Sequence, residues 1–197
     1  MSMLPLGFSL GRAVAGRVSG GSPKPMPLNI PKTGTIVHGV VIGNFEICHL
    51  FVSEGHNFVG HHQKPAGTSI MAEVSELVCV AGKGIVGDRY FGYRDNYKGQ
   101  ITFFEQEVHD ELCARFGVWD RGPEVYRRNV ITRGVCLNDL IGAEFELQGV
   151  RFFGREECRP CYWMNSAFFS GAENALKGHG GLRAEILAGG HLRRTVA

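Results

Sequence analysis

The stretch Glu144-Phe145-Glu146-Leu147-Gln148-Gly149-Val150-Arg151-Phe152-Phe153 guides our interpretation of the fold, because two short strand-like runs flank a Gln-Gly pair. Runs rich in aromatic and β-branched residues favour strands. A two-residue connection with glycine between such runs predicts a tight turn and therefore a β-hairpin. The hairpin delivers the chain to Cys158-Arg159-Pro160-Cys161, the most reactive stretch of the sequence.

Further runs of the same kind predict a mainly β domain. They lie at residues 36–43, 46–52, 72–80, 100–104 and 182–187. We expect the first two runs to be joined as a hairpin and the last run to be the final strand. Strands outnumber helices and follow one another as hairpins rather than crossovers. This order indicates a mainly β fold, a β-barrel with a few helices covering its ends.

Two helices are predicted, over residues 105–116 and 167–177. The first has acidic residues in its first turn and Gly117 at its end, as helix termini favour. Its apolar face is marked by Val108, Leu112 and Phe116. We expect His109 to lie on the outer surface of this helix. A short helical turn is expected at 137–142.

The length of 197 residues suits one domain with a sizeable core and is too short for two comfortable ones. Residues 1–34 are rich in proline and contain Gly-Gly-Ser, which predicts a flexible leader before a single domain at 35–197. The apolar stretch from Leu4 to Val14 is a poor signal peptide, since no basic residue precedes it. No apolar run approaches the length of a membrane span, so we expect no membrane partner.

The charge balance is ordinary, with a net charge of +2 and 20% charged residues. It gives no case for a nucleic-acid binder that works by neutralising phosphates, but it leaves room for an anionic small molecule. The six cysteines do not suggest a secreted disulfide scaffold, because four of them sit singly in apolar runs of a core-rich chain. We therefore expect a reducing compartment and cytoplasmic localisation.

The Cys158–Cys161 pair has several chemical interpretations. Two thiols separated by two residues can form a redox disulfide, supply half of a zinc site, or present one thiolate to a metal or cofactor. Two ordinary half-buried cysteines are a further alternative. A closed zinc site would need two more ligands from Cys136, His179 or His191, and no second tight pair exists. The neighbouring arginines and glutamates oppose one another, so composition does not decide which thiol is activated.

Two other motifs resemble ligand sites: a glycine-rich segment and a loop with three histidines. Residues 82–87 fit the glycine fingerprint of dinucleotide-binding sites, but the following Asp88-Arg89-Tyr90 is a poor helix start, so we consider the match fortuitous. The loop containing His56, His61 and His62 lacks a helical metal-ligand spacing. It is better interpreted as a solvated or substrate-facing loop.

Consecutive arginines, Arg127 and Arg128, enter a β-rich run. They are costly to bury unpaired, so they either face water or meet an anion. Arginine forks onto phosphate or carboxylate, which makes this segment the best candidate for anion binding. The alternative is a pair of surface arginines neutralised by Glu124 and Asp120.

Taken in order, five segments resemble the MOSC domain, the module at the C-terminus of molybdenum cofactor sulfurases that also occurs in amidoxime-reducing components. They are Gly84-Ile85-Val86-Gly87-Asp88, Arg128-Asn129-Val130-Ile131-Thr132-Arg133-Gly134, Leu140-Ile141-Gly142, Cys158-Arg159-Pro160-Cys161 and Gly181-Leu182-Arg183-Ala184. The resemblance spans residues 35–190. It implies a barrel-like β fold and a role around the molybdenum cofactor.

The resemblance also implies roles for particular residues. Cys161 would ligate molybdenum or carry sulfur as a persulfide. Cys158 is an extra thiol relative to many members of the family, and we take it as a second candidate catalytic thiol. The resemblance places Arg128 and Asn129 near the pterin and its phosphate. With them we expect Asp88, Arg127, Thr132 and Arg183 as cofactor-binding residues. At family level, molybdenum-ion and pyridoxal phosphate binding are implied as well.

The expected activity is reductive, on a small molecule such as an N-hydroxylated compound. The sequence contains no aminotransferase-like or iron–sulfur domain, so an external electron donor or a sulfur-donor protein is expected as partner. The alternatives are a dithiol oxidoreductase on a fold other than thioredoxin, and a non-enzymatic binding module. A thioredoxin-like domain would place its dithiol early in the chain, whereas Cys161 lies near the end.

Overall fold

The computed structural model describes residues 35–37, 40–42, 45–59, 61 and 63–195. The leader expected at 1–34 and His62 lie outside these residues. The larger of two sheets has the strand order β1-β2-β9-β10-β11-β7-β8-β3-β4. In chain order its strands are β1 (Thr35–Val37), β2 (Val40–Ile42), β3 (Glu46–Val52), β4 (Ala72–Glu73), β7 (Ile101–Glu105), β8 (Val130–Arg133), β9 (Glu144–Leu147), β10 (Val150–Glu157) and β11 (Leu182–Ala188).

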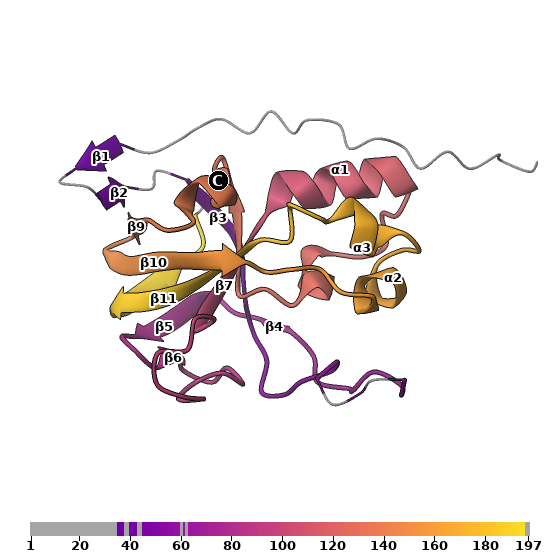
Figure 1. Cartoon of the computed structure of the whole chain (residues 1–197), viewed down its shortest axis with the longest axis horizontal. Helices are drawn as coiled ribbons and strands as arrows, with labels where there is room; N and C mark the ends of the chain where they lie inside the picture. Colours follow the sequence, from indigo (N-terminus) through magenta and orange to yellow (C-terminus); the bar gives the residue numbers. More distant parts are fainter. Residues whose placement is uncertain (1–34, 38–39, 43–44, 60, 62, 196–197) are drawn as a thin grey trace, which may run out of the picture.

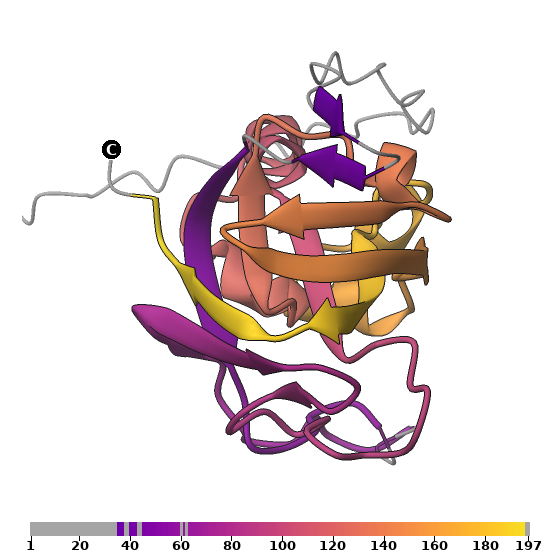
Figure 2. The ribbon, with the colours of Figure 1, turned by 90° about the vertical axis from the view of Figure 1, so that its left-hand side faces the viewer.

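The smaller sheet has the order β12-β5-β6. Its strands are β5 (Glu76–Val80), β6 (Gly84–Ile85) and β12 (Gly190–Arg193). The strands of the two sheets curve around a common interior (Figure 2). The mainly β class is thus confirmed, but within the described residues the sheets do not close into a barrel.

The hairpin of β9 and β10 is confirmed. Val150 pairs with Leu147, and Gln148 and Gly149 both have positive φ, 52° and 79°. Positive φ at both central residues is the geometry that two-residue hairpins favour, because it matches the twist of the strands. Strand β10 then runs on to Glu157, directly before Cys158.

Three expectations about the strands are wrong. The runs at 36–43 and 46–52 are not paired with each other: β1 pairs with β2, and β3 pairs with β8 and β4. A crossover exists, since β7 and β8 are parallel and the helix α1 (Gln106–Phe116) connects them. The strand at 182–187 is followed by β12, which pairs with β5. The β1–β2 pair is local, whereas the pairs β3–β8, β7–β8 and β5–β12 join residues distant in sequence, which local patterns do not specify.

The helices lie on one side of the molecule and most strands on the other (Figure 1). Adjacent side chains of a strand point to opposite faces of the sheet, and β7 uses this alternation. Phe103 enters the apolar core between the sheets, where it contacts the rings of Phe145 and Phe152. Phe104 enters a second core beneath the helices and stacks on Tyr126.

Helix α1 ends as predicted, with Gly117 in the left-handed conformation. The surface position expected for His109 is wrong, because its side chain is buried beneath the helix. Its Nδ1 lies 3.2 Å from the Tyr126 hydroxyl, and Cys113 lies one turn further along. The face of α1 that packs against the second core is therefore broader than the apolar pattern indicates.

The helix expected at 167–177 is replaced by two short ones, α2 (Trp163–Ala167) and α3 (Ala172–Ala175). Gly171 between them has φ 96°, which breaks the helix. The Asn165 side-chain oxygen accepts hydrogen bonds from the N–H groups of Gly171 and Glu173 and fixes this break. The turn at 137–142 is confirmed as the 3-10 helix η2 (Leu137–Leu140). None of the helices in the described ranges has the length and apolar character needed to span a bilayer.

Candidate functional site

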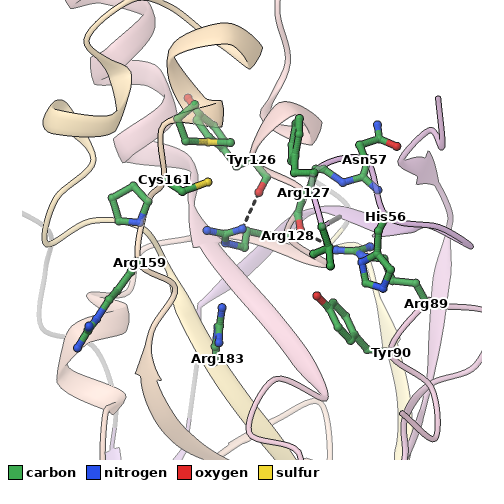
Figure 3. Close-up of a pocket in the computed structure, with 14 residues that line it drawn as sticks. His56, Asn57, Arg89, Tyr90, Tyr126, Arg127, Arg128, Arg159, Cys161 and Arg183 are labelled. Atoms are coloured by element: carbon green, nitrogen blue, oxygen red, sulfur yellow. Dashed lines mark hydrogen bonds between the residues drawn. The ribbon is translucent and has the colours of Figure 1, made fainter. Parts of the chain in front are cut away.

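A pocket of about 190 Å³ opens where β10 and β11 meet the segment before β8 and the loop after β3 (Figure 3). Five arginines line it together with one thiol. The described lining residues are His56, Asn57, Phe58, Val59, Arg89, Tyr90, Tyr126, Arg127, Arg128, Arg159, Pro160, Cys161, Met164 and Arg183. We call this cavity the arginine pocket.

The two cysteines of the pair occupy different environments. Cys161 is exposed and lines the arginine pocket, in the turn that leads into α2. Cys158 is buried, and its N–H donates to the Gly181 carbonyl at 2.7 Å. Both thiols are free. Cys161 is therefore the thiol that a bound ligand can reach.

Two glycines allow the chain to pass close behind Cys158. A Cβ atom at Gly180 would collide with the Cys158 carbonyl, and one at Gly181 would collide with the Phe103 carbonyl. Gly181 also has φ 90°, a conformation that other residues rarely adopt. These glycines bring β11, and with it Arg183, against the Cys158 segment.

Arg128 stabilises the Cys158 segment from the opposite side by hydrogen bonds. Its guanidinium donates to the carbonyls of Gly180 at 3.0 and 3.1 Å, Tyr126 at 2.7 Å and Cys158 at 3.3 Å. Arg128 is half-buried and forms no ion pair with a carboxylate of the described residues. Carbonyl partners satisfy its donors but leave its positive charge without a counter-charge.

Arg127 fastens the other wall of the arginine pocket. Its guanidinium donates to the carbonyls of Ser69 and Gly55 and to the Ser53 hydroxyl, at 2.8 to 2.9 Å. Its backbone has φ 56° at the end of the 3-10 helix η1 (Pro123–Tyr126). Burial and the neighbouring Arg89 lower the pKa of Arg127 to about 10. The alternative, a pairing of Arg127 and Arg128 with Glu124 and Asp120, is not formed.

The remaining arginines differ in their partners. Arg89 pairs with Asp88, and Arg183 pairs with Glu156 at 3.2 Å. Burial lowers the pKa of Arg183, but the adjacent Cys158 thiol and other neighbours outweigh it and raise the pKa overall. The described walls contain no carboxylate, so the arginine pocket carries excess positive charge. Such a pocket favours an anionic ligand.

Three sequence-predicted cofactor residues lie behind the arginine pocket rather than in its walls. The Asn129 side chain donates to Asp88 at 3.1 Å and to the Phe51 carbonyl, and it accepts from Thr102. Asp88 also accepts from the N–H groups of Ser53 and Tyr90. Thr132 is fully buried and donates to the Phe104 carbonyl. Their observed contacts hold the loops and strands that carry the arginines.

The sequence did not single out several of the lining residues. Arg89, Tyr90 and Asn57 come from loops, and Tyr126 and Met164 come from short helical turns. His56 lies in the loop interpreted as solvated or substrate-facing, and it does line the arginine pocket. Burial, together with Arg89 and Arg127, lowers its pKa. The position of Arg89 directly after the Gly84–Asp88 segment is the one signal that pointed to it.

The zinc hypothesis gains no support within the described parts of the chain, where no three His, Cys, Asp or Glu side chains gather as a metal site. His191 instead contacts Glu76 at 2.7 Å. The glycine-rich residues 82–87 form β6 and turns, with no helix after them. The expectation that no helix starts after this fingerprint is confirmed.

Comparison with known proteins identifies the fold. The chain superposes on the YuaD protein from Bacillus subtilis with a TM-score of 0.59, at 18% identity over 76% of this chain and 91% of that one. It superposes on YiiM from Geobacillus stearothermophilus with a TM-score of 0.55, at 13% identity over 76% and 71% of the two chains. For YiiM from Escherichia coli the TM-score is 0.50, at 16% identity over 75% and 70%.

The fold is MOSC-like. YuaD and YiiM are proteins of the MOSC type, and the order of the five sequence segments indicated the same fold. No protein-family model matches the sequence, and no curated protein matches it. At these identities the structural likeness supports the MOSC-like fold and leaves ligand and activity to the chemistry of the site.

Proposed function

We propose that the arginine pocket binds the molybdenum cofactor and that the Cys161 thiolate ligates the metal. One observation carries the proposal: an exposed thiol lines a pocket whose described walls hold five arginines and no carboxylate. The chemistry of these groups fits the cofactor. A thiolate is a soft ligand suited to such a metal, and guanidinium groups fork onto phosphate.

Particular residues serve particular parts of this function. Arg159 and Arg183 line the arginine pocket beside Cys161 and would hold the phosphate of the pterin. Arg127 and Arg128 contribute positive charge while their donors hold the pocket walls in place. Asn129 and Asp88 act one layer behind, because they position Arg89 and the loop after β3.

The reaction would be a two-electron reduction of a small N-hydroxylated compound. The N-hydroxylated group takes up two electrons and two protons, its N–O bond breaks, and one water is released. An amidoxime thereby becomes an amidine, and a hydroxylamine becomes an amine. The bound metal would supply the two-electron chemistry, and an external donor protein would supply the electrons. Among the described lining side chains, His56 is the group suited to exchanging protons near neutral pH.

The decisive experiment is metal and pterin analysis of protein purified from a host that makes the molybdenum cofactor. We expect molybdenum and pterin in near-equal amounts in the wild type and their loss in Cys161→Ala. Cys136→Ala is the matched control, because Cys136 is half-buried and does not line the arginine pocket. It should retain both.

Wild-type protein without molybdenum, or a Cys161→Ala variant with unchanged molybdenum, would overturn the proposal. In the first case the same thiol can be tested as a sulfur carrier. Incubation with a sulfur-donor protein, followed by mass measurement of the intact chain, would reveal a persulfide on Cys161. The exposure of Cys161 is the observation that favours this second function.

A further inference from the structure

A second cavity, of about 470 Å³, adjoins the arginine pocket. Its walls come from the loop that precedes β4, from η1 and from the end of α2. The apolar side chains in these walls are Phe58, Ile70, Met71, Val125 and Ala167. Glu124 and Arg127 are its charged lining residues. Its chemistry therefore differs from that of the arginine pocket, where five cations gather.

The two cavities share Asn57, Phe58 and Arg127 as wall residues. The Phe58 ring stacks on Trp163 with a centroid distance of 4.8 Å, and Trp163 follows Cys161 by two residues. Phe58 thus couples the second cavity to the turn that carries the thiol. Arg127 is held by its bonds to the loop carbonyls, so it is a fixed side chain that borders both cavities.

The rim of the second cavity carries an exposed apolar side chain. Ile70 is 76% exposed, although its side chain is large and aliphatic. Covering such a side chain with an apolar ligand is favourable, because it removes apolar area from water. A cavity of about 150 Å³ suffices for a benzene ring. The second cavity therefore has room for a ring-sized apolar group.

We infer that the second cavity binds the apolar body of a small organic molecule whose polar group lies in the arginine pocket. The substrate class is an aromatic or bulky aliphatic compound with a compact polar head. The inference rests on the proposed function where the head is an N-hydroxyl group. The adjoining cavities then set specificity, since the head is selected by charge and the body by apolar contact.

The first test measures ligand binding without any metal or activity. The probe is 1-anilinonaphthalene-8-sulfonate, an organic anion with an aromatic body, titrated by its fluorescence into metal-free protein. Val125→Trp fills the second cavity, and Ile70→Ser removes its apolar rim. We expect the Kd of the probe to rise at least fivefold in Val125→Trp and about threefold in Ile70→Ser.

Val86→Ser is the matched control, because Val86 is 49% exposed and lines neither cavity. It should leave the Kd unchanged. Arg159→Met should also weaken the probe, since the sulfonate lies in the arginine pocket. Ile70→Ser changes an exposed side chain and keeps the test valid even where Val125→Trp disturbs folding. Equal Kd values for wild type, Ile70→Ser and folded Val125→Trp would overturn the inference.

The second test uses the molybdenum-loaded protein with an electron donor and two substrates, acetamidoxime and benzamidoxime. Both carry the same amidoxime group, but acetamidoxime has a methyl group attached to it and benzamidoxime has a phenyl ring. We expect Val125→Trp to raise the KM for benzamidoxime at least fivefold and to change that for acetamidoxime less than twofold. Equal effects on both substrates would overturn the inference while the proposed function stands. If neither compound is reduced but the probe still distinguishes the variants, the proposed function fails and the binding site remains.

Discussion

The arginine pocket and the site of Glu105 both contain charged groups that form no ion pair within the described residues: Arg127 and Arg128 in the first, and Glu105 in the second. Arg127 and Arg128 direct their guanidinium groups at backbone carbonyls. Glu105, at the junction of β7 and α1, is 3% exposed and accepts a hydrogen bond from the Leu137 N–H at 2.9 Å. In each case a neutral backbone group serves as partner. Neither arrangement neutralises the charge.

The two sites differ in whether the charged group can become neutral near physiological pH. Burial, with Glu107 and Asp139 nearby, raises the pKa of Glu105 to about 7, so a proton can neutralise it near physiological pH. Burial lowers the pKa of Arg127 only to about 10, so the guanidinium keeps its charge. A buried carboxylate can therefore respond to pH, whereas buried arginines call for an anionic ligand. This contrast supports a ligand-binding role for the arginine pocket and a structural role for Glu105.

The largest expected effect is on the free energy of unfolding, and it comes from Arg128, which both stabilises the pocket walls by hydrogen bonds and contributes positive charge. Arg128→Met removes the donor from three carbonyls, and each carbonyl left unpaired costs about 1 to 3 kcal/mol. We expect a loss of about 4 kcal/mol in the free energy of unfolding, measured with urea. Calorimetric titration with sulfate should also show that anion binding is lost.

Arg159→Met is the matched comparison for this prediction. Arg159 lines the arginine pocket but is exposed, so its contribution is mainly charge. We expect unchanged stability and a sulfate Kd raised about fivefold. If Arg128→Met were as stable as Arg159→Met, the carbonyl contacts would not hold the Cys158 segment as we describe.

The next largest effect concerns Glu105. A carboxyl whose pKa is raised in the folded state stabilises the fold below its unfolded pKa, and this stability is lost as pH rises towards the folded pKa. With a rise from 4.5 to about 7, the free energy of unfolding should fall by about 3 kcal/mol between pH 4 and pH 8 through this group alone. Glu105→Gln removes the titration but keeps an oxygen for the Leu137 N–H.

Urea unfolding of both proteins across this pH range checks the effect. The difference in stability between Glu105→Gln and the wild type should move in favour of the variant by about 3 kcal/mol from pH 4 to pH 8. Comparing the two proteins at each pH cancels the titration of all other groups. A constant difference would show that Glu105 keeps an ordinary pKa, and the contrast with the arginines would disappear.

Local features of the fold could be predicted from the sequence. The hairpin of β9 and β10 depends on Gln148 and Gly149, whose conformations are set within a few residues. The end of α1 depends on Gly117 in the same way. The parallel pairs β7–β8 and β2–β9 could not be predicted, because the residues they join lie far apart in sequence.

The arginine pocket shows the same limit. Arg127, Arg128, Arg183 and Cys161 carry a charge or a thiol in a recognisable motif, and all four line the pocket. Asn129 directly follows Arg128, yet its side chain turns to Thr102, Phe51 and Asp88 behind the pocket. A sequence motif identifies residues that are adjacent in the chain, but the backbone geometry determines which of their side chains face the cavity. Tyr90 and Asn57 reach the pocket through loops with no pattern of their own.

The smallest expected effect tests whether the excess charge of the arginine pocket can still be increased. The groups around His56 are Arg89, Arg127, Asp88 and the Tyr90 ring; burial and the two arginines lower its pKa, so it is mainly neutral at pH 7. A bound anion favours the protonated imidazole, so affinity should rise as pH falls.

Sulfate is the suitable probe for this effect, because it does not titrate in this range. We expect its Kd to be about fivefold lower at pH 5.5 than at pH 7.5, equivalent to ~1 kcal/mol of charge interaction. His56→Gln should bind sulfate with the same Kd at both pH values, and an equal pH dependence in both proteins would exclude His56 as its source.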